Sequence, residues 1–317
     1  MGAALLAAGS TTATAGTIAL QLENDSFGRV NDADYTQGLR LSYTADNPPG
    51  WMQSLLPGRY QNRELNAQFF IGQAIFTPFE IFETELLEYD RPYAGWLYLG
   101  GALQAVDLIP GGALNTADRL DFSLGIVGPS SGAEQAQRST HQLLRTYDIH
   151  GWSNQLHDEA TLQLSYARKW AHVETVAENG LQFEISGTLG GHLGNVNTSL
   201  ISAAGVRLGR DLYSSFGVSA FAPYISGPEN SLRSGGGWYL YSDVQLRLVH
   251  QDIFLDGNTF KDSHSVEKEP HVVEWQAGWV LPIGRYRWSA YYARRSQEFI
   301  DQYAQVDFFG IGLSASF

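Results

Sequence analysis

Apolar and polar residues alternate along many segments of this chain, most regularly at its end. From Phe309 to Phe317 the odd positions hold Phe, Ile, Leu, Ala and Phe, whereas the even positions hold only Gly or Ser. The side chains of a β-strand point alternately to its two faces. The pattern therefore predicts a final strand with one apolar face and one face of small or polar residues.

The same alternation recurs in segments 36–45, 120–127, 181–188, 239–248, 273–281 and 285–292. Their polar faces carry charged residues, namely Arg40, Asp121, Glu184, Asp243, Arg247, Glu274 and Arg287. In a soluble β-sandwich such charges would face solvent and the apolar faces would form the core. The apolar faces here carry wide Trp and Tyr side chains over long strands, which favours contact with lipid. We therefore expect a transmembrane β-barrel.

Counting these segments gives roughly twelve strands between residues 17 and 317, an even number as in single-chain bacterial barrels. The predicted strands start near residues 17, 35, 65, 93, 117, 160, 179, 196, 236, 270, 284 and 305. The fold class is thus an all-β, twelve-stranded antiparallel barrel. If the N-terminus is periplasmic, the loops after odd-numbered strands are extracellular. The connections 47–64 and 210–235 then lie on the periplasmic side, where they are longer than expected.

One segment departs from the β pattern. Residues 133–146 are rich in helix formers and follow Pro129-Ser130-Ser131-Gly132. Ser130 or Ser131 is a candidate N-cap. We expect a short helix inside an extracellular loop.

Composition narrows the class of protein further. The mean hydropathy is -0.19, and no apolar run approaches the ~18 residues of a helical membrane span. An aromatic content of 13% suits the girdles of a barrel, and the absence of Cys excludes thiolate chemistry. The net charge of -13 argues against a nucleic-acid partner. Residues 1–16 resemble a signal-peptide remnant or a disordered leader.

Polar clusters fall at the predicted extracellular rim. Glu23-Asn24-Asp25 ends the first strand, Asp34-Tyr35-Thr36 opens the second, and Asp90-Arg91-Pro92-Tyr93 opens the fourth. Gln137 and His141 lie four residues apart on the predicted helix, hence on one face. Each cluster by itself is also what a turn or an exposed loop would contain. Their common side predicts one site at the outer leaflet.

The chemistry that these residues permit is ester hydrolysis. His141 is suited to act as general base on a water, and Gln137 to orient that water or a carbonyl group. Asp25, with Asn24 and nearby carbonyl groups, offers hard oxygen ligands for Ca²⁺. Arg91 is suited to pair with a phosphate or with the oxyanion. A serine nucleophile is the competing hypothesis, although no G-x-S-x-G elbow surrounds the nearby Ser130, Ser131 or Ser139.

Several short segments, taken in order, resemble the lipid A 3′-O-deacylase family. They are Glu23-Asn24-Asp25, Asp34-Tyr35-Thr36-Gln37-Gly38, Thr77-Pro78, Asp90-Arg91-Pro92-Tyr93-Ala94-Gly95-Trp96, Gly128-Pro129-Ser130, Gln137 with His141, Gly151-Trp152 with Gln155-Leu156, and Phe254-Leu255-Asp256-Gly257-Asn258. These segments span residues 23 to 258. The terminal aromatic Phe317 also resembles the assembly signal of outer-membrane barrels.

The resemblance implies a twelve-stranded outer-membrane barrel that removes the 3′-linked acyloxyacyl group from lipid A. It also implies dependence on Ca²⁺ and a phospholipase A2-like mechanism, in which a histidine activates water. Carried over by matching segment, the site residues are Asn24, Asp25, Thr36, Gln137 and His141. At Arg91 the family pattern has a lysine, so the charge is kept while the geometry differs.

Two rival functions stay open at this point. The first is a passive pore or a structural barrel. The second is an outer-membrane phospholipase with a serine nucleophile, although that family's His-x-Ser motif is absent here. The partners expected are lipopolysaccharide and the outer membrane, with no nucleic acid, and the sequence defines no oligomeric state.

Overall fold

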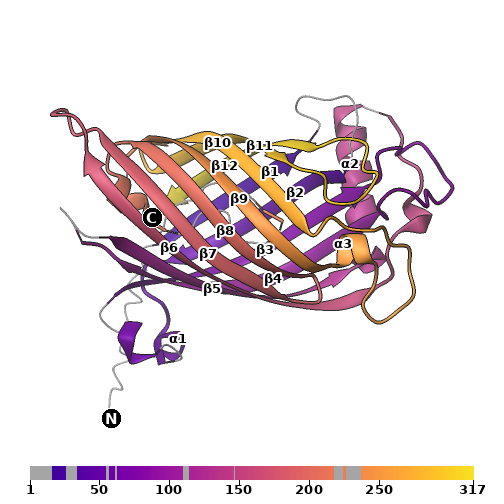
Figure 1. Cartoon of the computed structure of the whole chain (residues 1–317), viewed down its shortest axis with the longest axis horizontal. Coiled ribbons are helices and arrows are strands. Elements are labelled where there is room, and N and C mark those ends of the chain that lie inside the picture. The colour runs from indigo at the N-terminus through magenta and orange to yellow at the C-terminus, as the bar shows by residue number, and fades with distance from the viewer. Residues whose placement is uncertain are drawn as a thin grey trace, which may run out of the picture.

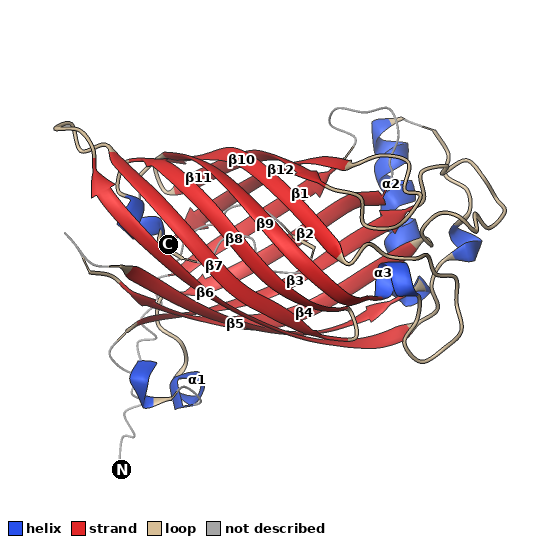
Figure 2. Cartoon of the chain, in the orientation of Figure 1, coloured by secondary structure: helices blue, strands red, loops and turns tan. Residues whose placement is uncertain are grey.

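The structure is a computed structural model that describes residues 16–25, 34–54, 57–60, 63–109, 114–145, 147–217, 224–225 and 237–317. Twelve antiparallel strands close into one barrel, as predicted (Figures 1 and 2). The strands are β1 (Gly16–Asn24), β2 (Asp34–Ala45), β3 (Glu64–Thr77), β4 (Ala94–Asp107), β5 (Asn115–Val127), β6 (Glu159–Thr175), β7 (Gln182–Gly194), β8 (Asn197–Gly209), β9 (Tyr239–Asp252), β10 (His271–Ile283), β11 (Tyr286–Arg295) and β12 (Val306–Ser316). The predicted leader lies outside the described residues except for Gly16, which begins β1.

The last strand closes the barrel against the first. Leu20 of β1 pairs with Leu313 of β12 on one side and with Leu41 of β2 on the other. At the periplasmic end, the backbone groups of Gly16 and Phe317 exchange hydrogen bonds of 3.1 and 3.0 Å. Closure leaves no strand edge unpaired, which a sheet inside a membrane requires.

The two faces of the strands differ as their alternation predicts. Outward-facing apolar side chains are exposed, for example Leu99 at 59% and Leu200 at 65%. Inward-facing charges are buried and paired, for example Arg119 with Asp121 at 2.7 Å. The outer face is therefore suited to lipid, and the lumen holds the polar side chains. Among the described residues, no helix is long and apolar enough to cross a membrane.

Helices occupy the connections. They are α1 (Gly50–Ser54), η1 (Gly58–Tyr60), η2 (Pro129–Ser131), α2 (Ala133–Leu144), η3 (Trp152–Asn154), η4 (Leu212–Ser215) and α3 (Ile253–Asp256). The helix expected over 133–146 is α2, which lies at the extracellular end of the barrel (Figure 2). The predicted serine cap is wrong. The N-cap is Gly132 at φ 70°, without a side-chain hydrogen bond, because Ser131 Oγ donates instead to the carbonyl oxygen of Gly128 at 2.6 Å.

The long connection after β8 does not simply turn back in the periplasm. Of its central part the structure describes Tyr224 and Ile225, and both are buried in the barrel. The Tyr224 ring packs edge-on against Phe76 at 4.9 Å and Phe254 at 5.0 Å, and its hydroxyl bonds Asp252 at the outer end of β9. At these two residues the connection therefore lies inside the barrel.

Candidate functional site

Three of the predicted site residues meet where β1 ends and β2 begins. Asn24 donates from Nδ2 to the carbonyl oxygen of Thr36 at 3.0 Å, and the backbone N–H of Asp25 approaches the same oxygen at 3.4 Å. The hydroxyl of Thr36 bonds that of Thr77, at the end of β3, at 2.7 Å. The outer ends of these three strands thus form one polar corner, which we call the wall group: Asn24, Asp25, Thr36 and Thr77.

A β-bulge turns Thr36 toward the outside of the barrel. The register of β2 against β3 shifts between Tyr35 and Gln37, so Thr36 is the extra residue. Tyr35 points into the lumen, is fully buried, and packs edge-on against Phe308 at 5.2 Å. Gly38 leaves room for this ring, because a Cβ there would lie 2.0 Å from the Tyr35 hydroxyl. Tyr35 inside thereby fixes Thr36 outside.

Helix α2 packs onto the outer wall next to this corner. A Cβ on Gly95 of β4 would lie 2.1 Å from the Cβ of Ala133, so glycine lets the helix approach closely. Gln73 of β3 donates from Nε2 to the carbonyl oxygen of Ser131 at 2.7 Å. An apolar cluster seals the contact between wall and helix: Ile75, Ile81, Tyr93, Ala133, Ile149 and Trp152.

The helix turns its two predicted site residues toward the wall. Ala133, Gln137 and His141 are spaced four apart and share one face. Gln137 is 1% exposed and His141 is 8% exposed. Because β3 carries Thr77 and also contacts α2, the helix residues and the wall group lie at the same end of the outer wall (Figure 1).

A loop beyond α2 orients both side chains. The indole N–H of Trp152 donates to Oε1 of Gln137 at 2.9 Å. His141 Nδ1 lies 3.0 Å from the carbonyl oxygen of Tyr147, and the two rings meet edge-on at 5.1 Å. Since a carbonyl oxygen only accepts, Nδ1 of the neutral ring carries the proton. The lone pair of His141 is therefore on Nε2, as a general base requires.

The wall group offers oxygen atoms of the type that Ca²⁺ prefers. The carboxylate of Asp25 is buried at 4% exposure. Asn24 uses its amide nitrogen toward Thr36, which turns its amide oxygen to the other side. Within the described ranges, no group of three or more His, Cys, Asp or Glu residues is placed to hold a metal. One carboxylate with neutral oxygens fits Ca²⁺ in donor type, because Ca²⁺ accepts carbonyl and amide oxygens.

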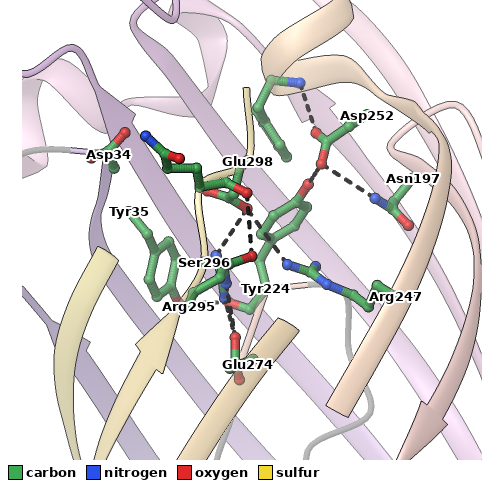
Figure 3. Close-up of polar contacts among 12 residues, drawn as sticks. Asp34, Tyr35, Asn197, Tyr224, Arg247, Asp252, Glu274, Arg295, Ser296 and Glu298 are labelled. Atoms are coloured by element: carbon green, nitrogen blue, oxygen red, sulfur yellow. Dashed lines mark hydrogen bonds and ion pairs between the residues drawn. The ribbon is translucent and has the colours of Figure 1, made fainter. Parts of the chain in front are cut away.

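Arg91 is not brought to the wall group. Its guanidinium lies in the mouth of the barrel, 3.3 Å from Glu298 and 3.9 Å from Asp34, and 5.4 Å from the Phe76 ring. Figure 3 shows the same Glu298 contacting Arg247. These contacts with the carboxylates inside the barrel mouth give Arg91 a structural role.

Glu298 is the centre of the charge cluster in the barrel mouth. It lies 3.3 Å from Arg295 and 3.5 Å from Arg247, in addition to Arg91. Burial raises the pKa of this carboxyl, but the guanidinium groups around it outweigh burial and hold its pKa below the usual range. Glu298 is therefore charged and ties the extracellular loop 296–305 to the barrel.

The candidate serine nucleophiles are engaged in turns or exposed. Ser130 donates to Asp158 at 2.7 Å, and Ser131 donates to the carbonyl oxygen of Gly128. Ser139 is an exposed residue of α2. These contacts hold the loop before α2 rather than pair a serine with His141.

Sequence reasoning missed three residues of this site: Thr77, Tyr147 and Trp152. Thr77 and Trp152 stand in segments that carry the family resemblance, so that resemblance was a usable signal. Tyr147 acts through its backbone carbonyl group, which any residue type would provide. No sequence signal could have found it.

The fold and the site define a class of protein: an outer-membrane β-barrel with polar side chains at one end of its outer wall and on a helix packed against that wall. A family model described as "Outer membrane protein LpxR" matches residues 1–317. The chain therefore belongs to the LpxR family and lies in the bacterial outer membrane, and the resemblance noted in the sequence is confirmed.

A solved structure shares this fold. LpxR from Salmonella typhimurium superposes with a TM-score of 0.79 at 18% identity, over 95% of this chain and 100% of that chain. The β domain of the Bordetella autotransporter BrkA matches with a TM-score of 0.48 at 13% identity, over 96% of this chain and 100% of that chain. No curated protein sequence matches.

Proposed function

We propose that this protein is a Ca²⁺-dependent hydrolase that removes the 3′-linked acyloxyacyl group from lipid A in the outer leaflet. One observation carries the proposal: a histidine with its lone pair on Nε2 lies on a helix packed against the outer barrel wall, at the same end as the wall group. A site on the outer wall faces lipid rather than the lumen. A lipid of the outer leaflet could reach it laterally.

His141 is the general base of the proposed reaction. Its Nε2 takes a proton from a water molecule, whose oxygen attacks the carbonyl carbon of the ester. The bond between that carbon and the 3′ oxygen then breaks, and the departing oxygen receives the proton back from His141. The products are the free acyloxyacyl acid, with its secondary ester intact, and a 3′ hydroxyl. The carbonyl oxygen of Tyr147 holds the ring in the required tautomer and stabilises its protonated form.

Asp25 and Asn24 are the residues that would hold Ca²⁺, with Thr36 fixing both of them. When bound, the cation would supply positive charge for the oxyanion that forms on the ester. Gln137 would contribute a polar contact from the helix side. Arg91 has no part in this mechanism, because its ion pairs lie inside the barrel mouth.

The test is mass spectrometry of lipid A incubated with the purified, folded protein. We expect lipid A to lose the mass of the 3′ acyloxyacyl group when Ca²⁺ is present, and to be unchanged after chelation. His141→Ala should lower the rate by on the order of 10²–10⁴-fold, the usual contribution of a general base. Heat-modifiable migration on gels verifies that the variant has folded.

Three outcomes would each contradict part of the proposal. If folded wild-type protein leaves lipid A intact in the presence of Ca²⁺, the proposed deacylase function is wrong. If the folded His141→Ala variant keeps full activity, His141 is not the general base, although the proposed function is not contradicted. If activity persists after Ca²⁺ is chelated, Asp25 does not act as a Ca²⁺ ligand in the reaction.

A further inference from the structure

Trp152 lies in the loop that follows α2 and contacts the proposed site. It begins the short helix η3, beyond α2, and is 2% exposed. Its indole N–H reaches the side chain of Gln137 at 2.9 Å, across fifteen residues of sequence. This contact links the loop to the helix face that carries Gln137 and His141.

The chemistry of this contact fixes the orientation of the amide. An indole N–H can only donate, so the atom of Gln137 facing it must be the oxygen. The amide nitrogen, with its two N–H groups, is consequently turned away from Trp152. A free glutamine could present either end to a substrate, whereas this one presents donors on the side away from the loop.

Trp152 itself is held firmly. Its ring packs against Tyr93 at 5.0 Å, and Gln155 donates to its carbonyl oxygen at 3.0 Å. The preceding Gly151 has φ +84°, and a Cβ there would lie 2.7 Å from the Tyr93 ring. The main chain of Leu156 donates to Tyr93 at 2.9 Å. An anchor fixed to the barrel wall therefore sets the direction of the Gln137 amide.

We propose that Trp152 is a positioning residue that makes Gln137 a hydrogen-bond donor to the carbonyl oxygen of the scissile ester. This inference rests on the proposed function and adds to it a direction for one polar group. Negative charge develops on that oxygen as water attacks, so a preoriented N–H donor there lowers the barrier. An amide free to flip would lose part of that effect.

The first test is Trp152→Phe, which keeps an aromatic ring in the apolar cluster and removes the N–H group. We expect kcat to fall about tenfold, the equivalent of ~1.4 kcal/mol of transition-state stabilisation. KM should stay within about twofold, because the contact acts on the charge that develops in the transition state. Unchanged heat-modifiability verifies the fold, and wild-type kcat in this variant would overturn the inference.

Gln137→Glu separates a donor from an acceptor role. The carboxylate would still accept from Trp152, but it would offer no N–H group to the ester. We expect this variant to lose at least as much activity as Gln137→Ala. Activity close to that of wild type would mean that Gln137 acts as an acceptor, and the inference would be wrong.

A double-mutant cycle tests whether Trp152 acts through Gln137. In the Gln137→Ala background, Trp152→Phe should have no further effect on kcat. If the two substitutions lower kcat independently, so that their fold-losses multiply in the double variant, Trp152 has a merely structural role and the inference fails. Because every rate is compared with an active wild type, this failure is distinguishable from failure of the deacylase function.

Discussion

Two charged or titratable residues at the outer rim have different surroundings, although the sequence placed them together. His141 faces the outer wall and is held by a backbone carbonyl group, whereas Arg91 is buried among carboxylates in the barrel mouth. A buried guanidinium needs a counterion, and Glu298 provides it at 3.3 Å. The two residues therefore differ in the groups that contact them, and their positions along the chain do not reveal this difference.

Glu298→Gln tests the cluster in the barrel mouth. Removing one anion leaves Arg91, Arg247 and Arg295 with less compensation, so we expect destabilisation of about 3–5 kcal/mol, typical of a broken buried ion pair. The measurement is the temperature at which heat-modifiable migration is lost. Glu85→Gln, an exposed loop residue, is the matched control and should change stability by less than about 0.5 kcal/mol.

The same variant has a predicted pH dependence. The folded pKa of Glu298 lies below its usual value, so its contribution is present above the unfolded pKa of about 4.3 and is lost as the pH falls below it. Wild type and Glu298→Gln should therefore differ most near neutral pH and converge in acid. A difference in stability that persists unchanged at pH 2 would contradict this account of the cluster.

At the scale of elements, the site depends on how closely α2 approaches the wall. Two features hold the helix against the wall: the apolar cluster between them, and Gly95, whose missing side chain lets the helix approach closely. Since His141 is two turns from Ala133, a small displacement at the start of α2 would move the base relative to the wall group. The helix and the outer ends of β1 to β3 therefore work as one unit.

Gly95→Ala tests this docking. The added Cβ would lie 2.1 Å from that of Ala133, so the helix must shift and deacylation should fall by roughly 100-fold, as for a misplaced catalytic group. The barrel should still fold. Gly101→Ala, on the same strand, is the matched control, because its Cβ would lie no closer than 3.4 Å to any neighbour. Equal activity of the two variants would show that helix approach does not limit the reaction.

At the scale of the whole molecule, the lumen and the outer wall have separate roles. Buried ion pairs join neighbouring strands on the lumen side of the barrel, among them Glu184 of β7 with Lys169 of β6 at 2.9 Å and Glu274 of β10 with Arg295 of β11 at 2.7 Å. Tyr224 adds a ring from the connection after β8. Because Tyr35 donates to the carbonyl oxygen of Tyr224 at 2.6 Å, the lumen also supports the strand that carries Thr36.

The buried ion pairs and aromatic side chains in the lumen predict that the protein does not conduct ions. In planar bilayers, purified wild type should give no stable single-channel conductance, since paired charges and buried aromatics leave little room for water in a narrow barrel. An open porin recorded in the same bilayers is the control. A steady conductance from wild type would favour the rival function of a passive pore.

The sequence alone determined the strands, their two faces and the end of the barrel at which the candidate site residues lie. Alternation with a period of two is a local property of a strand, so it shows in neighbouring residues. An even strand count then puts Asn24, Thr36 and His141 on the side opposite Phe317. The resemblance in short segments named the family, and the match over residues 1–317 agrees with it.

Only the tertiary structure decided which of these residues face one another. Gln137 and Trp152 are fifteen positions apart, and Tyr35 and Tyr224 are 189 apart. Such contacts depend on the packing of whole elements, which no local pattern encodes. The bulge at Thr36 and the burial of Arg91 are of this kind. The closing strand to Phe317 was visible in the sequence because alternation is a local property of the strand, whereas the orientation of His141 depends on one carbonyl group in a loop.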